Sequence, residues 1–168
     1  LVVSYGELLQ QVSAVSSWLL RQPGVVGTAS PRVGLSCASG VDYIILALAI
    51  LKAGGCLVPI AEELTEPERR ELIQRTALCG ILTGPDSKWR PVGEGCGHAD
   101  SGACWFPLDD PGFDHEAEFH ELNPAFIRFS SGTTGRSKGV VLSHRRLEER
   151  IIAANAALGI GPGDKVDW

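Results

Sequence analysis

The sequence predicts an α/β fold in which βαβ units build a mainly parallel sheet covered by helices. Short apolar runs of strand length alternate with longer segments in which apolar residues recur at helical spacing. Hydrophobic residues make up 44% of the chain and charged residues 21%, so a substantial core can be buried. The length of 168 residues corresponds to one domain or to part of a larger one.

Two capping boxes mark where helices are expected to begin in the first half of the chain. Ser4 is followed by Glu7 and Thr65 by Glu68, so each pair can satisfy free backbone N–H groups of a first turn. The segment 41–53 is apolar almost all round, which predicts a buried helix. The expected elements are a helix from Ser4 to about Pro23, a strand at 32–37, the buried helix, a strand at 56–60, a helix from Thr65 to about Thr76 and a strand at 79–83.

The pattern weakens between residues 84 and 123, where Gly, Pro, Asp and His recur. We interpret this segment as a surface excursion with one strand at 103–106. Runs typical of strands return at 125–129 and 139–142. A last helix is expected to be capped by Ser143 and closed by Gly159.

Composition excludes several classes of function. The net charge of −5 and the lack of a basic tract argue against a nucleic-acid partner. The longest apolar run, at 43–51, is too short for a transmembrane segment. Five Cys without a CxxC pair favour a reducing, cytoplasmic location. The lack of Met and the strand-like residues 164–168 indicate a fragment at both ends.

The most informative segment is SSGTTGRSKG at residues 130–139, which lies between two strand-like runs. Its three Gly let backbone N–H groups turn toward an anion, its five hydroxyls can donate to phosphate oxygens, and Lys138 adds a mobile positive charge. A plain flexible turn would not need this concentration of donors. The segment therefore predicts a polyphosphate cradle.

A Walker loop is the first alternative for this cradle, because Gly132 could begin its G-x-x-x-x-G-K-[ST] pattern. Ser137 stands where the second Gly belongs, and Gly139 replaces the hydroxyl residue that would hold Mg²⁺. The residues after Lys138 also have a strand pattern, whereas a Walker loop opens a helix. The sequence thus predicts a different phosphate loop.

The segment SSGTTGRSKGVVLSH at 130–144 resembles the signature loop of the adenylate-forming (AMP-dependent) synthetases and ligases. This family includes acyl-CoA synthetases, peptide-synthetase adenylation domains and luciferases. LKAGGCLVPI at 51–60 is similar to the family's LKAG-x-x-x-VP segment, and SYGEL at 4–8 resembles its early [ST]-Y-x-E-L element. Ser137 departs from the Pro that usually precedes the Lys. The resemblance covers nearly the whole chain except about residues 84–123.

The resemblance implies that a carboxylate attacks the α-phosphate of Mg·ATP, that pyrophosphate is released, and that a thiol then takes the acyl group from the adenylate. The implied cofactors are ATP and Mg²⁺, with coenzyme A or a pantetheine thiol as co-substrate and a small-molecule carboxylate as substrate. Lys138 would stabilise phosphate charge, and the Ser130 hydroxyl would contact Mg²⁺. The implied ATP-phosphate residues are Ser130, Ser131, Gly132, Thr133, Thr134, Gly135 and Lys138.

The resemblance also implies that residues 1–168 are part of the large amino-terminal (adenylation) domain, without the carboxy-terminal domain, and that they are inactive alone. Thr133-Thr134 favours an acyl-CoA synthetase, an acid–thiol ligase of fatty acid metabolism. Two alternatives stay open: an amino-acid-activating adenylation domain, and a non-catalytic nucleotide- or partner-binding module. A P-loop kinase is a more distant one.

Two other clusters are set aside. His115 and His120 are five residues apart, so they do not match the H-E-x-x-H zinc pattern. Cys96, His98 and Cys104 lack a matching second pair of ligands. Arg145 is expected to pair with Glu149 four residues further on.

Overall fold

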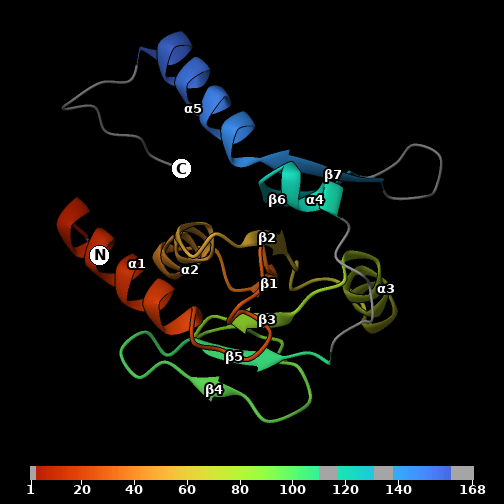
Figure 1. Cartoon of the computed structure of the whole chain (residues 1–168). Helices are drawn as coiled ribbons and strands as arrows, with labels where there is room; N and C mark the ends of the chain where they lie inside the picture. Colours follow the sequence, from red (N-terminus) through yellow and green to blue (C-terminus); the bar gives the residue numbers. More distant parts are fainter. Residues whose placement is uncertain (1–2, 110–116, 131–137, 160–168) are drawn as a thin grey trace.

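The computed structural model describes residues 3–109, 117–130 and 138–159, which form a seven-stranded sheet with helices on both faces (Figure 1). The strand order is β4-β5-β3-β1-β2-β6-β7. The strands are β1 (Arg32–Ser36), β2 (Cys56–Pro59), β3 (Gly80–Thr83), β4 (Cys96–Gly97), β5 (Cys104–Pro107), β6 (Pro124–Ser130) and β7 (Lys138–Ser143). The helices are α1 (Tyr5–Leu19), α2 (Val41–Lys52), α3 (Glu66–Thr76), α4 (Ala117–Glu121) and α5 (His144–Leu158).

The four central strands, β3, β1, β2 and β6, are parallel, as the alternation of strands and helices predicts. Val33 of β1 lies between Leu57 of β2 and Gly80 of β3. The outer strands β5, β4 and β7 join antiparallel. The sheet is therefore mixed. In its parallel centre, α2 connects β1 to β2 and α3 connects β2 to β3.

The two crossover helices, α2 and α3, lie on opposite faces of the sheet, and the sheet separates two apolar cores. The first core joins α1 and α2 to one face, with Leu35 and Leu57 fully buried. The second joins α3 and α4 to the other face through side chains such as Val58 and Ile127. The helix that was expected to be buried, α2, is buried on one side only, because Leu48 on its outer side is 39% exposed.

Both predicted capping boxes are present and fix where α1 and α3 begin. The Ser4 hydroxyl accepts a hydrogen bond from the Glu7 amide, and the Glu7 carboxylate accepts one from the Ser4 amide at 2.8 Å. Thr65 and Glu68 repeat this arrangement. Ser143 caps α5 as predicted by accepting from the Arg146 amide.

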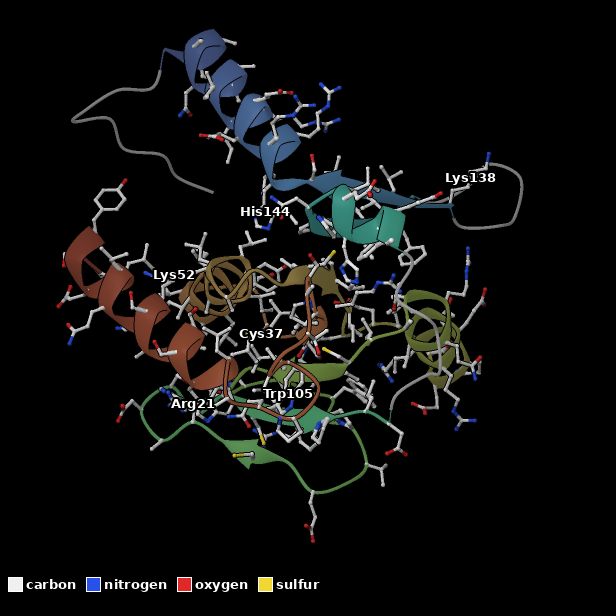
Figure 2. All side chains as sticks on the ribbon, viewed as in Figure 1. Arg21, Cys37, Lys52, Trp105, Lys138 and His144 are labelled. Carbon is white, nitrogen blue, oxygen red and sulfur yellow. The ribbon has the colours of Figure 1, made fainter. Side chains whose placement is uncertain are left out.

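The segment 84–123 is less of a surface excursion than its composition predicts. The strand expected at 103–106 is β5, and it pairs with β3 inside the sheet. Its Trp105 is fully buried, and the indole Nε1 donates to the Pro23 carbonyl at 3.2 Å (Figure 2). The local pattern predicts this strand but not its pairing with β3, because the pairing depends on residues that are distant in the sequence.

β7 and α5 extend away from both cores (Figure 1). The residues Lys138–Val141 of β7 are exposed, and α5 has no buried residue. Among the described helices, none is long and apolar enough to cross a membrane.

Candidate functional site

The predicted cradle joins two neighbouring antiparallel strands. β6 ends at Ser130, β7 begins at Lys138, and these two residues are direct partners in the sheet. The strand after the loop confirms the distinction from a Walker loop, which would open a helix. Figure 2 shows Lys138 at the start of β7, where it is exposed.

The remaining predicted cradle residues, Ser131, Gly132, Thr133, Thr134 and Gly135, lie outside the described residues, as does the side chain of Ser130. Their roles, and the Mg²⁺ contact of Ser130, stay predictions. The structure places the two ends of the cradle side by side, with Lys138 at one of them.

The base of the cradle packs against α3 through Phe129. Phe129 lies directly opposite Gly139 in the β6–β7 pair. A Cβ atom at Gly139 would stand 3.2 Å from Cε1 of the Phe129 ring, so a side chain there would press on the ring. The Arg75 guanidinium of α3 lies 5.5 Å from the centroid of the same ring. This packing fixes the strand ends from which the cradle extends.

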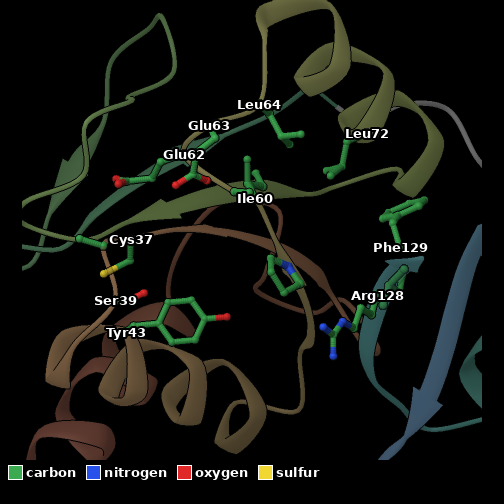
Figure 3. Close-up of a pocket in the computed structure, with 14 residues that line it drawn as sticks. Cys37, Ser39, Tyr43, Ile60, Glu62, Glu63, Leu64, Leu72, Arg128 and Phe129 are labelled. Atoms are coloured by element: carbon green, nitrogen blue, oxygen red, sulfur yellow. The ribbon is translucent and has the colours of Figure 1, made fainter. Parts of the chain in front are cut away.

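A cavity of about 510 Å³ lies at the carboxyl ends of β1, β2 and β6 (Figure 3). The chain turns to α2 after β1 and to α3 after β2, and these helices cover opposite faces. Adjacent parallel strands whose connections diverge in this way leave a crevice, which is where open α/β sheets bind ligands. The lining residues are Cys37, Ala38, Ser39, Tyr43, Pro59, Ile60, Ala61, Glu62, Glu63, Leu64, Leu72, Ile127, Arg128 and Phe129.

Positively and negatively charged residues lie on different sides of this cavity. Arg128 of β6 and Tyr43 of α2 lie on one side, and Glu62 and Glu63 on the other (Figure 3). Burial raises the pKa of the Tyr43 hydroxyl, and it raises the pKa of the Cys37 thiol to about 11 with a further contribution from Asp42. Both groups are therefore neutral at physiological pH, and Cys37 is a poor nucleophile.

The rim of the cavity is held by the buried Arg69. Its Nη2 atom donates to the carbonyl of Leu64 at 2.7 Å, and its Nη1 atom pairs with Glu66 at 3.2 Å. The guanidinium also lies 4.3 Å from the ring centroid of Trp89. One side chain thus ties the turn after β2 to the start of α3 and to the segment after β3.

The sequence predicts the cradle, which stays a prediction, but it does not predict the cavity. Tyr43, Glu62 and Arg128 belong to no recognisable sequence motif. Only the rule that open α/β sheets bind ligands at the carboxyl ends of their strands could have pointed to them. The predicted pair of Arg145 and Glu149 is confirmed at 3.8 Å. Within residues 3–109, 117–130 and 138–159, no three His, Cys, Asp or Glu side chains are grouped to hold a metal ion.

Comparison with known proteins agrees with the fold. The family model described as AMP-binding enzyme matches residues 2–167. The chain belongs to the AMP-binding enzyme family. The resemblance to adenylate-forming synthetases and ligases, based on residues 4–8, 51–60 and 130–144, is thereby confirmed.

Several relatives of this AMP-binding chain are peptide synthetases. Tyrocidine synthase 3 of Brevibacillus parabrevis is 28% identical over 168 residues, which cover 97% of this chain and 2% of that protein. Nonribosomal peptide synthetase verP of Clonostachys rogersoniana is 33% identical over 84% of this chain and 7% of its own length. The chain therefore spans only a small part of these relatives.

Solved structures of the family share the fold. The crystal structure of CmiS6 has a TM-score of 0.72 and 27% identity, and the match covers 98% of this chain and 38% of that one. ATP-bound MatB from Rhodopseudomonas palustris has a TM-score of 0.68 and 25% identity, with 96% and 34% covered. This AMP-binding chain thus corresponds to about a third of those proteins.

Proposed function

We propose that the protein carrying this chain activates a carboxylic acid as an acyl-adenylate and releases pyrophosphate. The observation that carries this proposal is the pairing of Ser130 with Lys138, because it closes the base of a Gly- and hydroxyl-rich segment at the carboxyl end of β6. Membership of the AMP-binding family and the order of the three sequence motifs support it. The donors of residues 130–138 suit an ATP polyphosphate in number and chemistry.

ATP, when bound, supplies the α-phosphorus that the carboxylate oxygen attacks, and the bond to the bridging oxygen of the β-phosphate breaks. The Lys138 ammonium offsets the charge that the departing pyrophosphate gathers. The backbone amides and hydroxyls of residues 131–135 would hold the β- and γ-phosphates, and the Ser130 hydroxyl would hold Mg²⁺, which would offset phosphate charge when bound. In this proposal, the residues of the cradle bind the leaving group and do not position the attacking carboxylate.

We further propose that the substrate is an amino acid or a related small acid, and that a pantetheine thiol accepts it. The relative from Clonostachys rogersoniana supports this choice, because it is named as a nonribosomal peptide synthetase. The prediction of an acyl-CoA synthetase of fatty acid metabolism is based on Thr133-Thr134 alone. That dipeptide carries less weight than similarity along most of the chain.

The test is pyrophosphate–ATP exchange by the protein that carries this chain, with Mg²⁺ and a panel of amino acids and fatty acids. We expect exchange to depend on one or a few amino acids. Lys138→Ala should slow exchange by about 10²-fold or more, as removal of a charge-stabilising donor does elsewhere. Lys52→Ala, whose Nζ donates to Ser13 on α1, is the matched control and should leave exchange unchanged.

The outcomes separate the alternatives. Exchange that depends only on fatty acids would retain adenylate formation but contradict the amino-acid substrate. ATP binding without exchange for any acid would support a non-catalytic binding module instead. Unchanged exchange in the Lys138→Ala variant would remove the proposed role of the cradle.

A further inference from the structure

The cavity at the carboxyl ends of β1, β2 and β6 has a positively charged side. Arg128 lies two residues after Phe126 on β6, so both side chains leave the face of the sheet that α2 covers. Figure 3 shows Arg128 on this side, with the hydroxyl end of Tyr43 directed toward it. Burial raises the pKa of the Tyr43 hydroxyl, and the positive charge of Arg128 acts against this shift. The charge of Arg128 thus reaches the hydroxyl of Tyr43.

The Arg128 guanidinium has no partner in the described part of the chain. It forms no hydrogen bond or ion pair with residues 3–109, 117–130 or 138–159. A guanidinium presents its donors in a planar fork that matches the two oxygens of a carboxylate. The neutral Tyr43 hydroxyl can donate a further hydrogen bond. This side of the cavity is therefore suited to a carboxylate.

The Cys37 end of the cavity has a negative potential. Burial raises the pKa of the Cys37 thiol to about 11, and the negative charges of Asp42, Glu62 and Asp86 add to this shift. The half-buried Glu62 carboxylate is held in place, because its Oε1 atom accepts a hydrogen bond from the Lys88 amide at 2.8 Å. This end of the cavity is therefore suited to a cation such as an ammonium group.

Apolar side chains line the cavity between its two charged ends. They belong to Ile60, Leu64 and Leu72 and to Phe129 of β6. Ile60 is almost completely buried. The volume of about 510 Å³ is within the range of about 300–1,000 Å³ that is usual for small-molecule sites. The middle of the cavity is thus suited to the apolar body of a small ligand.

The distribution of charge selects among ligands. A polyphosphate would bring several negative charges toward Glu62 and Asp86, which repel them. A fatty acid could pair with Arg128, but its apolar chain would cover the Glu62 carboxylate without replacing the water that this carboxylate loses. In an α-amino acid the two charged groups are on adjacent carbons, so they cannot reach both ends. A ligand with a carboxylate and an ammonium at opposite ends of an apolar body matches all three regions.

We propose that this cavity binds a zwitterion of that kind, an ω-amino acid or a short apolar peptide. The Arg128 guanidinium and the Tyr43 hydroxyl donate to its carboxylate. The Glu62 carboxylate accepts from its ammonium, and Leu64 and Leu72 pack against its apolar body. This binding requires neither ATP nor the cradle, so it stands or falls separately from the proposed acyl-adenylate chemistry.

The test measures equilibrium binding of 6-aminohexanoate, hexanoate and hexylamine to the protein that carries this chain, without ATP. Hexanoate lacks the ammonium group, and hexylamine lacks the carboxylate. Arg128→Gln should weaken binding of 6-aminohexanoate and hexanoate by about tenfold and leave hexylamine unchanged, because only the first two ligands carry a carboxylate. Glu62→Gln should weaken 6-aminohexanoate and hexylamine and leave hexanoate unchanged. Its amide oxygen can still accept from the Lys88 amide.

Two exposed residues of α3 provide matched controls. Arg70 and Glu71 lie outside the cavity lining, so Arg70→Gln and Glu71→Gln should leave all three affinities unchanged. Leucyl-leucine separates the two kinds of zwitterion. Tighter binding of the dipeptide than of 6-aminohexanoate would assign the cavity to a peptide, and the reverse order would assign it to an ω-amino acid.

Alkylation of Cys37 shows whether the ligand lies in this cavity. Cys37 lines the cavity, whereas Cys96 is exposed in β4. A saturating zwitterion should slow alkylation of Cys37 about tenfold or more and leave Cys96 unchanged, as measured by peptide mapping. The proposal is overturned if neither zwitterion binds saturably, if Cys37 is not protected, or if Arg128→Gln and Glu62→Gln each affect all three ligands equally.

Discussion

Gly80 of β3 leaves the space that the Trp105 indole of β5 fills. A Cβ atom at Gly80 would lie 2.1 Å from Cζ2 of the indole, far closer than packed carbons approach. Trp105 is paired in register with Leu82, and its ring reaches diagonally to the position of Gly80. Besides the backbone pairing of β3 with β5, the packing of the Trp105 ring on Gly80 thus joins the antiparallel edge of the sheet to its parallel centre.

Replacement of Gly80 by Ala is expected to lower the free energy of unfolding by about 1–3 kcal/mol, as overpacking does in a dense core. Gly97→Ala in neighbouring β4 is the control, because its nearest atom would be the Ala103 carbonyl oxygen at 4.0 Å. Urea unfolding of both variants measures the difference. Equal midpoints would show that the indole can move aside without cost.

Arg69 and Arg70 both pair with Glu66 but differ in exposure, 7% against 71%. Arg69→Met should lower the free energy of unfolding by about 1–3 kcal/mol, because the Leu64 carbonyl loses its buried donor. Arg70→Met removes a surface pair worth only about 0–1 kcal/mol. Urea titrations of the two variants test this order. A larger loss for Arg70→Met would contradict it.

The five cysteines should differ widely in reactivity. Burial raises the pKa of Cys56 and of Cys79 to about 12, so both remain protonated at pH 7 and react slowly with alkylating agents. Cys96 is exposed and should be modified first. Mass spectrometry after brief alkylation checks the order. Modification of Cys56 in the folded chain as fast as Cys96 would refute it.

Acid should weaken the two capped helices. Hydrogen bonds from Ser4 lower the pKa of Glu7, and those from Thr65 lower the pKa of Glu68, both from 4.5. A depressed folded-state pKa gives stability that is present above the unfolded value of 4.5 and is lost as pH falls through the folded value. The urea midpoint should therefore fall on acidification below that value.

Glu7→Gln and Glu68→Gln remove the groups that titrate in this acid transition. The double variant should show a shallower decrease of the urea midpoint with falling pH than the unsubstituted chain. Glu94→Gln, in an exposed segment away from the helices, is the control and should leave the acid dependence as it is. An unchanged slope in the double variant would mean that other carboxylates dominate.

The sequence predicts those elements whose signals are local. The capping boxes at Ser4 and Thr65 and the apolar runs of β1 and β2 depend on neighbouring residues, and they are confirmed. The place of β5 depends on Trp105 meeting Gly80 from another strand, which no local pattern encodes. For this reason the weakly patterned segment 84–123 was interpreted as mostly surface.

The candidate site divides in the same way. Lys138 was predicted because a Gly- and hydroxyl-rich segment between strands is recognisable from sequence alone. Arg128 and Tyr43 were missed, because they meet only after α2 and α3 have gone to opposite faces of the sheet. The exclusion of nucleic acid and the Mg²⁺ contact of Ser130 stay predictions.

β6 serves three environments at once. Phe126 packs against the first core, Ile127 and Phe129 against the second, and the strand ends where the cradle starts. A destabilising change on either face of this one strand displaces the residues that begin the cradle. Substitutions in β6 should therefore lower the free energy of unfolding and the affinity for nucleotide together. Substitutions in β3 or β5 can lower the free energy of unfolding and leave the affinity for nucleotide unchanged. In β6, the same residues would then be under selection both for stability and for activity.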